Sequence, residues 1–254
     1  MTDGTKKYDI VLFGVTGFTG KLAVEYLLQR SRNERDDGKN DEYKNLKWAV
    51  SARNKSKAEQ ILKDIVSSKI TTATTASSSS TEEEVDLPQL PPVLEADLLC
   101  ETDDDVSKLK EIVSSTKIVL TCSGPFELYG KTLVKLCAES GVHYCDITGE
   151  TDFVRGNISS LDNTARETGA CIISHCGNDC VPNDLLVLEL HKLATSKNCR
   201  LEEIQTYQEF NAEATMSGGT LKTAQYQLGK NRNNKKDGGS SFDPLLTKVR
   251  SFAQ

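Results

Sequence analysis

Three regularly spaced glycines near the start of the chain, Gly14, Gly17 and Gly20, could bind the phosphates of a nucleotide. They follow the apolar run from Asp9 to Phe13 and precede a stretch of helical character. Because glycine has no Cβ, such a turn lets the backbone approach a pyrophosphate, and the N–H groups that begin the next helix point toward it. The spacing is G-x-x-G-x-x-G, a variant of the commoner G-x-G-x-x-G. We predict a dinucleotide site here; the alternative is an ordinary strand–turn–helix unit.

A cation at the end of the second predicted strand bears on the identity of the dinucleotide. An acidic residue there binds the ribose 2′-hydroxyl of NAD, whereas an arginine accommodates the 2′-phosphate of NADP. The segment from Ser51 to Lys55 contains two cations, Arg53 and Lys55, and no carboxylate. A guanidinium matches a phosphate in a bidentate way. We therefore predict NADP as the cofactor, with NAD less favoured; the alternative is a solvated surface arginine.

Two other strand ends complete the predicted cofactor site. Gly124 and Pro125 follow the fourth predicted strand and Asp97 ends the third, at the edge where a cofactor lies in such sheets. Ordinary turn residues are the alternative at both places. The predicted cofactor-binding residues are Gly14, Thr16, Gly17, Phe18, Thr19, Gly20, Arg53, Asp97, Gly124 and Pro125.

Polar residues also follow the fifth and sixth predicted strands, and two interpretations of them stay open. They could be acid–base groups for a hydride transfer, or they could be turn and cap residues. We assign no catalytic residue among them. They are Asp146, Thr148, Gly149, Glu150, His175, Asn178 and Asp179.

The eight cysteines predict neither disulfides nor a metal site. Cys171, His175, Cys176 and Cys180 form the one local cluster, and its spacing matches no usual zinc pattern. Five cysteines lie in apolar stretches, where a free thiol behaves as a small hydrophobe. We expect reduced thiols throughout, with the apolar five being Cys100, Cys122, Cys137, Cys145 and Cys171.

Alternating strands and helices must position these groups. A helix whose apolar side carries Leu22, Ala23, Tyr26 and Leu27 follows the glycine turn. Buried strands that alternate with helices predict an α/β fold with a doubly wound parallel Rossmann sheet. The further strands are expected at 46–51, 93–97, 117–122, 143–147 and 170–174, and the helices at 56–66 (opened by a Ser56–Glu59 capping box), 103–113, 128–140 and 158–168.

Two polar stretches interrupt the alternating strands and helices, and the regular alternation ends after residue 180. Residues 31–44 and the low-complexity tract 71–84 are predicted to be solvated loops. Beyond residue 180 we expect a helix at 183–193, a strand at 200–210 and a helix at 218–228. This predicts a dinucleotide-binding domain over residues 1–180 and the start of a smaller mixed α/β domain over residues 181–254.

Composition and charge exclude several classes of function. The formal net charge of −6 argues against nucleic-acid binding. The sequence contains neither the basic-then-apolar order of a secretory signal at its N-terminus nor an apolar run long enough to span a bilayer. We expect an intracellular protein, cytosolic or peripheral on a membrane or lipid droplet.

Taken together in order, these stretches resemble the saccharopine dehydrogenase-like oxidoreductases, a family that includes trans-acting enoyl reductases. The resemblance implies an NAD(P)-binding Rossmann domain, a mixed α/β second domain, and a role in lipid or glycolipid metabolism at membranes or lipid droplets. Members continue well beyond SGGT, so we expect this second domain to be incomplete and the chain to bind dinucleotide with little turnover. The matching motifs are GVTGFTG, SARNKSK, CSGPFELYG, HYCDITGE, GND followed by VPNDL, and SGGT.

Three functions are therefore weighed. The first is an NADP-dependent oxidoreductase that acts on a small lipid-derived substrate, as a peripheral lipid-surface protein and a homodimer. The second is a catalytically inactive dinucleotide-binding scaffold or sensor at a lipid surface. The third, a short-chain dehydrogenase, rests only on the Tyr-x-x-x-Lys spacing of Tyr226 and Lys230, far beyond the predicted sheet.

Overall fold

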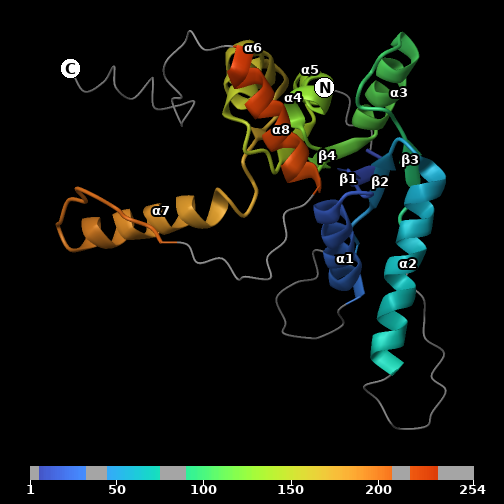
Figure 1. Ribbon diagram of the computed structural model, residues 1–254, viewed down its shortest axis with the longest axis horizontal. Coiled ribbons are helices and arrows are strands. Elements are labelled where there is room, and N and C mark those ends of the chain that lie inside the picture. The colour runs from blue at the N-terminus through green and yellow to red at the C-terminus, as the bar shows by residue number, and fades with distance from the viewer. Residues whose placement is uncertain (1–5, 33–44, 75–89, 208–217, 234–254) are drawn as a thin grey trace.

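A parallel six-stranded sheet forms the centre of the computed structural model, which describes residues 6–32, 45–74, 90–207 and 218–233 (Figure 1). The strand order is β3-β2-β1-β4-β5-β6, and every neighbouring pair is parallel. This is the order of a doubly wound dinucleotide-binding sheet, so the predicted fold class is confirmed. The strands are β1 (Tyr8–Phe13), β2 (Trp48–Ala52), β3 (Val93–Glu95), β4 (Thr116–Thr121), β5 (His143–Asp146) and β6 (Ile172–Ile173).

Helices cover both faces of the sheet because each crossover between parallel strands carries one. The side chains of α1 and α2 pack with Leu12 and Val50 on one face. Those of α3, α5 and α6 pack with Val11 and Phe13 on the other. The helices are α1 (Phe18–Arg32), α2 (Lys55–Thr74), α3 (Asp103–Ser114), α4 (Phe126–Tyr129), α5 (Lys131–Ser140), α6 (Thr151–Thr168), α7 (Val181–Ser196) and α8 (Gly218–Asn233).

The buried face of α1 differs from the predicted one. Val24, Leu27 and Leu28 are buried, whereas Leu22 and Tyr26 are about half exposed. The Tyr26 ring instead lies 5.4 Å from the Arg30 guanidinium, and its hydroxyl accepts a hydrogen bond from Arg30 Nε at 3.2 Å. The predicted stripe does not coincide with the buried one, because aromatic and apolar residues occur on both sides of this helix.

The start of α2 also corrects a prediction. The helix begins at Lys55, and the side-chain Oδ1 of Asn54 accepts a hydrogen bond from the Lys57 N–H at 2.9 Å. Asn54 is therefore the N-cap, and the predicted Ser56–Glu59 capping box is wrong. The helix runs on to Thr74, so the first residues of the predicted 71–84 loop are helical. The rest of that loop, and residues 33–44 of the predicted 31–44 loop, lie outside the described residues.

Three other boundaries differ from the sequence-based expectation. The predicted helix 128–140 is two helices, α4 and α5, which meet at Gly130, where a Cβ would lie 2.7 Å from the Phe126 carbonyl oxygen. Helix α6 begins at Thr151, seven residues earlier than predicted. The described part of the predicted strand 200–210, residues 200–207, is not a strand. Its last three residues lie outside the described residues.

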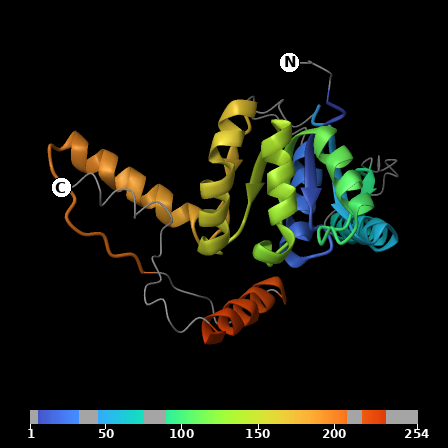
Figure 2. The ribbon, with the colours of Figure 1, turned by 90° about the horizontal axis from the view of Figure 1, so that it is seen from above.

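The two helices after the sheet are placed differently from each other. Helix α7 extends away from the sheet, and none of its residues is buried (Figures 1 and 2). Helix α8 lies across the end of the sheet from which the glycine turn emerges, and its first turn is next to the start of α1 (Figures 1 and 2). A segment distant in the sequence therefore reaches the predicted cofactor site.

Candidate functional site

The glycine turn after β1 has a separate geometric reason for each glycine. Gly14 has a φ of +90°, and a Cβ there would lie 2.7 Å from Ser123 Oγ on the neighbouring β4 loop. A Cβ on Gly20 would overlap the Gly14 carbonyl oxygen, so only glycine lets α1 pack against the turn. Gly17 donates its N–H to the Gly14 carbonyl oxygen at 2.9 Å and is itself exposed. The turn is therefore closed on the protein side and open on the solvent side.

A cavity of about 440 Å³ lies over this turn, at the carboxyl ends of β1, β2, β3 and β4. This is the place where dinucleotides bind in doubly wound sheets. Gly20 and Pro125 do not line it: Gly20 is buried behind the turn, and Pro125, which follows a cis peptide bond, is buried before α4. The other eight predicted residues line the cavity: Gly14, Thr16, Gly17, Phe18, Thr19, Arg53, Asp97 and Gly124.

Cations gather on the β2 side of this cavity. The Arg53 side chain is 71% exposed, and its guanidinium lies 3.9 Å from the Asp97 carboxylate, which is a loose contact. Lys57 lies one helical turn further on and lines the same cavity. Within the described ranges, the Lys57 ammonium forms no ion pair. Lys57 was not predicted from the sequence, because it lies in the first turn of α2, beyond the strand end that the prediction considered.

Ser51 provides a buried polar group at the floor of the cavity. The residue is only 1% exposed, and its hydroxyl has no hydrogen-bond partner among the described residues. A buried hydroxyl without a partner costs about 1–3 kcal/mol, so such groups are usually satisfied by a ligand or water. This orphan hydroxyl fits a ligand that carries hydroxyl or phosphate groups. It was not predicted as a site residue, because a serine inside a strand carries no motif.

The carboxylate at the end of β5 has a structural role. Asp146 is 1% exposed and accepts hydrogen bonds from the Tyr144 hydroxyl at 2.8 Å and the Thr148 N–H at 3.0 Å. It also accepts hydrogen bonds from Ser174 Oγ at 3.1 Å and the His175 N–H at 3.3 Å. Burial raises the pKa of the Asp146 carboxyl, although these donors oppose the shift. The carboxylate thus ties the end of β5 to the segment after β6.

Glu150 and His175 are engaged in the same way. Buried Glu150 accepts hydrogen bonds from the N–H groups of Phe126 at 2.7 Å and Glu127 at 2.9 Å, which begin α4. His175 Nδ1 lies 2.7 Å from the Thr148 carbonyl oxygen, and because a carbonyl only accepts, this ring nitrogen is the donor. These contacts favour the turn-and-cap interpretation. None of the seven residues singled out at the ends of β5 and β6 lines the glycine-turn cavity.

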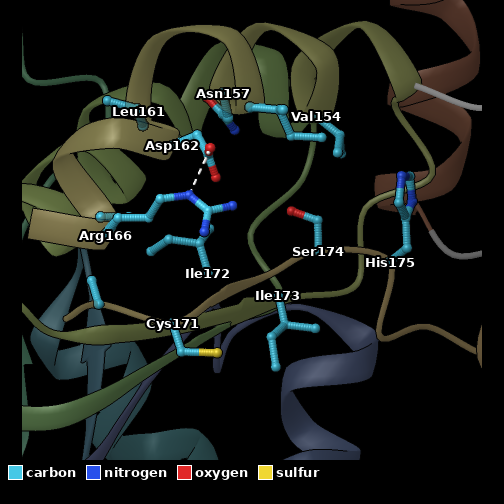
Figure 3. Close-up of a pocket in the computed structure, with 13 residues that line it drawn as sticks. Val154, Asn157, Leu161, Asp162, Arg166, Cys171, Ile172, Ile173, Ser174 and His175 are labelled. Carbon is cyan, nitrogen blue, oxygen red and sulfur yellow. Dashed lines mark hydrogen bonds and ion pairs between the residues drawn. The ribbon is translucent and has the colours of Figure 1, made fainter. Parts of the chain in front are cut away.

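A second cavity, of about 550 Å³, lies between α6 and β6 (Figure 3). Apolar side chains such as Val154, Leu161 and Ile172 dominate its lining. Arg166 also lines it, but its guanidinium already contacts the Asp162 carboxylate at 3.0 Å. This cavity is the larger one, yet it lacks a glycine turn and a cluster of unpaired cations in its described lining, so the phosphate-binding features belong to the smaller cavity.

All eight cysteines are free. Burial raises the pKa of Cys122 to about 12 and that of Cys145 to about 11, so both thiols stay protonated at neutral pH. Cys171 is exposed rather than buried, although it lines the mainly apolar cavity between α6 and β6. Across the described ranges, no group of three or more His, Cys, Asp or Glu side chains could hold a metal ion. In the same ranges, no helix is long and apolar enough to cross a bilayer.

The amino-acid sequence is similar to a known family of proteins. A family model described as the saccharopine dehydrogenase NADP binding domain matches residues 97–173. A saccharopine dehydrogenase-like oxidoreductase of Rattus norvegicus is 28% identical over 229 residues, which cover 90% of this chain and 48% of that protein. A trans-acting enoyl reductase of Mycobacterium leprae is 31% identical over 192 residues, covering 76% of this chain and 37% of that protein.

Two further comparisons concern a relative whose name states its location in the cell and a solved structure with a similar fold. A lipid droplet localized protein of Caenorhabditis elegans is 29% identical over 186 residues, covering 73% of this chain and 37% of that protein. The structure of apo saccharopine dehydrogenase from Saccharomyces cerevisiae aligns with a TM-score of 0.50 and 12% identity, over 75% of this chain and 32% of that chain, and supports the fold. The chain spans less than half the length of each of these relatives.

Proposed function

Because the chain belongs to the saccharopine dehydrogenase-like oxidoreductases, we propose that it binds NADP(H) in the glycine-turn cavity and acts as an NADP-dependent oxidoreductase. The matched NADP-binding family model supports the cofactor class. The choice of NADP over NAD rests on Arg53 and Lys57, which line the cavity at the end of β2 where an NAD enzyme would have a carboxylate. This pair of cations beside the glycine turn is the observation that carries the proposal.

Each part of the cavity then has a role toward the cofactor. The backbone N–H groups of the turn and of the first residues of α1 bind the diphosphate. Arg53 and Lys57 bind the 2′-phosphate, and the orphan hydroxyl of Ser51 pairs with a polar group of the adenosine half. The bound cofactor supplies a hydride to the substrate. Asp97, the single carboxylate in the described lining, lies beside Arg53 on the side of β3.

A lipid-derived substrate is the second part of this proposal. Its support is the names of two relatives, a trans-acting enoyl reductase and a lipid droplet localized protein. We accordingly propose a substrate with an acyl or enoyl chain and a peripheral position on a lipid surface, with a homodimer as the assembly. Reduction of an enoyl thioester by NADPH would test the substrate class directly.

One observation favours a catalytically inactive sensor as the second candidate. The buried carboxylates Asp146 and Glu150 hold backbone groups, and no histidine is in the described lining of the cavity. Tyr129, Asp97 and Lys222 are the polar titratable side chains that remain there for proton transfer, besides the cations of the β2 side. Binding of NADPH without turnover would support this alternative.

The two candidates are separated by one pair of measurements. Calorimetry gives the dissociation constants for NADPH and NADH, and absorbance at the NADPH band follows cofactor oxidation with a panel of enoyl and acyl thioesters. The oxidoreductase requires NADPH to bind more tightly than NADH and to be consumed with at least one substrate. Tight NADPH binding without consumption supports the sensor, whereas the absence of binding contradicts both.

A further inference from the structure

A segment far from the Rossmann motifs in the sequence completes the wall of the cofactor cavity. Gly218, Gly219 and Lys222, from the first turn and a half of α8, line the cavity together with the glycine turn after β1. The Thr223 hydroxyl lies 3.7 Å from where a Cβ on Gly124 would stand, so α8 packs close to the loop after β4. The residues of α8 lie outside the matched range 97–173.

The charge of Lys222 has no partner in the described residues. Its side chain is exposed and forms no ion pair there, although lysines elsewhere on the surface, such as Lys131 and Lys192, have carboxylate partners. The described lining of the cavity thus contains three cationic side chains, Arg53, Lys57 and Lys222, against one carboxylate, Asp97. A ligand that carries two or four negative charges is electrostatically complementary to this excess of positive charge.

The position of α8 indicates which part of the ligand Lys222 meets. Arg53 and Lys57 come from the β2 side, whereas Thr223, the neighbour of Lys222, lies at the β4 side. Strand β1 lies between β2 and β4, and neighbouring strands are about 4.8 Å apart, so the two sides are separated by about 10 Å. The diphosphate of a dinucleotide binds at the crevice between β1 and β4, where the strand order reverses.

A second, independent observation in the same lining supports a ligand in this cavity. The Ser51 hydroxyl, on a residue that is 1% exposed, lies in the same lining and has no hydrogen-bond partner among the described residues. The site therefore does not depend on the helix start of α8 alone. It combines a buried unpaired hydroxyl, a glycine turn that is open to solvent, and cations from two separate segments, the β2–α2 connection and α8.

We propose that Lys222 of α8 binds the diphosphate of the dinucleotide, so that the α8 segment completes the cofactor site from the β4 side. This inference rests on the proposed function. The cations then bind different parts of the cofactor. Arg53 and Lys57 recognise the 2′-phosphate that distinguishes NADP, whereas Lys222 contacts the diphosphate that NADP and NAD share. Lys222 therefore strengthens the binding of both cofactors and does not contribute to the preference for NADP over NAD.

Calorimetry on Lys222→Gln and Lys57→Gln tests this division with four ligands: NADPH, NADH, ADP-ribose and 2′-AMP. Lys222→Gln should weaken NADPH, NADH and ADP-ribose by about tenfold each and leave 2′-AMP unchanged, because 2′-AMP has no diphosphate. Lys57→Gln should weaken NADPH and 2′-AMP and leave NADH unchanged. Lys222→Arg should restore most of the affinity.

Lys110→Gln is the matched control, because Lys110 is an exposed lysine of α3 that does not line the cavity. All four affinities should be unchanged in it, and the melting temperature of each variant should match the wild type. Unchanged NADPH and NADH affinities in Lys222→Gln would overturn the inference, as would a loss confined to NADPH and 2′-AMP. Failure of the wild-type chain to bind any of the ligands would instead refute the proposed function.

Discussion

The loops after β1 and β2 and the loops after β5 and β6 leave the same edge of one sheet, yet they use their polar groups differently. Around Arg53 and Lys57, the side chains line a cavity, and within the described residues their only ion pair is the loose 3.9 Å contact between Arg53 and Asp97. Around Asp146 and Glu150, every hydrogen bond described for the carboxylate goes to a backbone or side-chain donor of the same fold. The first region is available to a ligand, and the second is occupied by the protein itself.

This difference gives a rule for polar residues at strand ends. Position at the carboxyl edge of a parallel sheet is common to both regions, so position alone does not identify a ligand site. The two regions differ in whether the surrounding protein forms hydrogen bonds with the polar groups at the strand ends. Substitutions in the β5–β6 region should therefore act on folding, whereas substitutions in the β1–β2 region should act on cofactor affinity.

The largest effect is expected for Glu150→Ala. The substitution removes the acceptor for one buried and one partly buried N–H group at the start of α4, and we expect the free energy of unfolding to fall by about 3 kcal/mol. Urea denaturation measures this loss, and Glu150→Gln, which keeps one acceptor oxygen, should lose less. If the variant instead kept nearly wild-type stability and bound NADPH more weakly, Glu150 would belong to the cofactor site. The contrast between the two regions would then be wrong.

Gly17→Val should produce the opposite pattern. A Cβ at this position would meet the Gly14 carbonyl oxygen at 3.3 Å, which is tight but tolerable, and the branched side chain would enter the open side of the turn. We expect NADPH and NADH binding to weaken by at least about a hundredfold, or about 2.7 kcal/mol, with a nearly unchanged melting temperature. Unaltered cofactor affinity in calorimetry would show that the phosphates bind elsewhere.

Arg53→Asp should change preference more than overall binding. Replacing the guanidinium with a carboxylate removes a contact to the 2′-phosphate worth about 1.5–3 kcal/mol and adds repulsion, while the ribose hydroxyl of NADH gains an acceptor. The ratio of the NADH and NADPH dissociation constants is the quantity to measure. We expect this ratio to fall by about tenfold or more, and a constant ratio would mean that Arg53 is a surface residue without a role.

Asp9 provides the smallest effect and a pH dependence. The Lys117 ammonium at 2.7 Å, followed by the Lys47 N–H, lowers the pKa of this carboxyl below its ordinary value of 3.8. Its stabilising contribution is therefore present above pH 3.8 and is lost as the pH falls through the lowered pKa. Because the pair is partly exposed, Asp9→Asn should cost less than about 1 kcal/mol near neutral pH and nothing measurable in strong acid. A larger cost in acid, measured by urea denaturation, would contradict this assignment.

Much of the fold and of the β1–β2 region was predictable because the signals there are local. Alternating buried strands and helices indicated the sheet, and the glycine spacing with Arg53 indicated a cavity that eight of the ten predicted residues do line. Lys222 could not be predicted, because α8 reaches the cavity only through the tertiary fold. The roles of Asp146 and Glu150 depend on hydrogen-bond partners up to 29 residues away, which no spacing reveals.

Hydrogen–deuterium exchange with and without NADPH tests the contrast between the two regions most directly, because it reads backbone protection along the whole chain. We expect saturating NADPH to slow exchange at the amides of residues 14–20 and 53–57 and to leave residues 146–150 and His175 unchanged. Protection confined to residues 146–150 and His175, with none at the glycine turn, would contradict the assignment of the cofactor to the β1–β2 region.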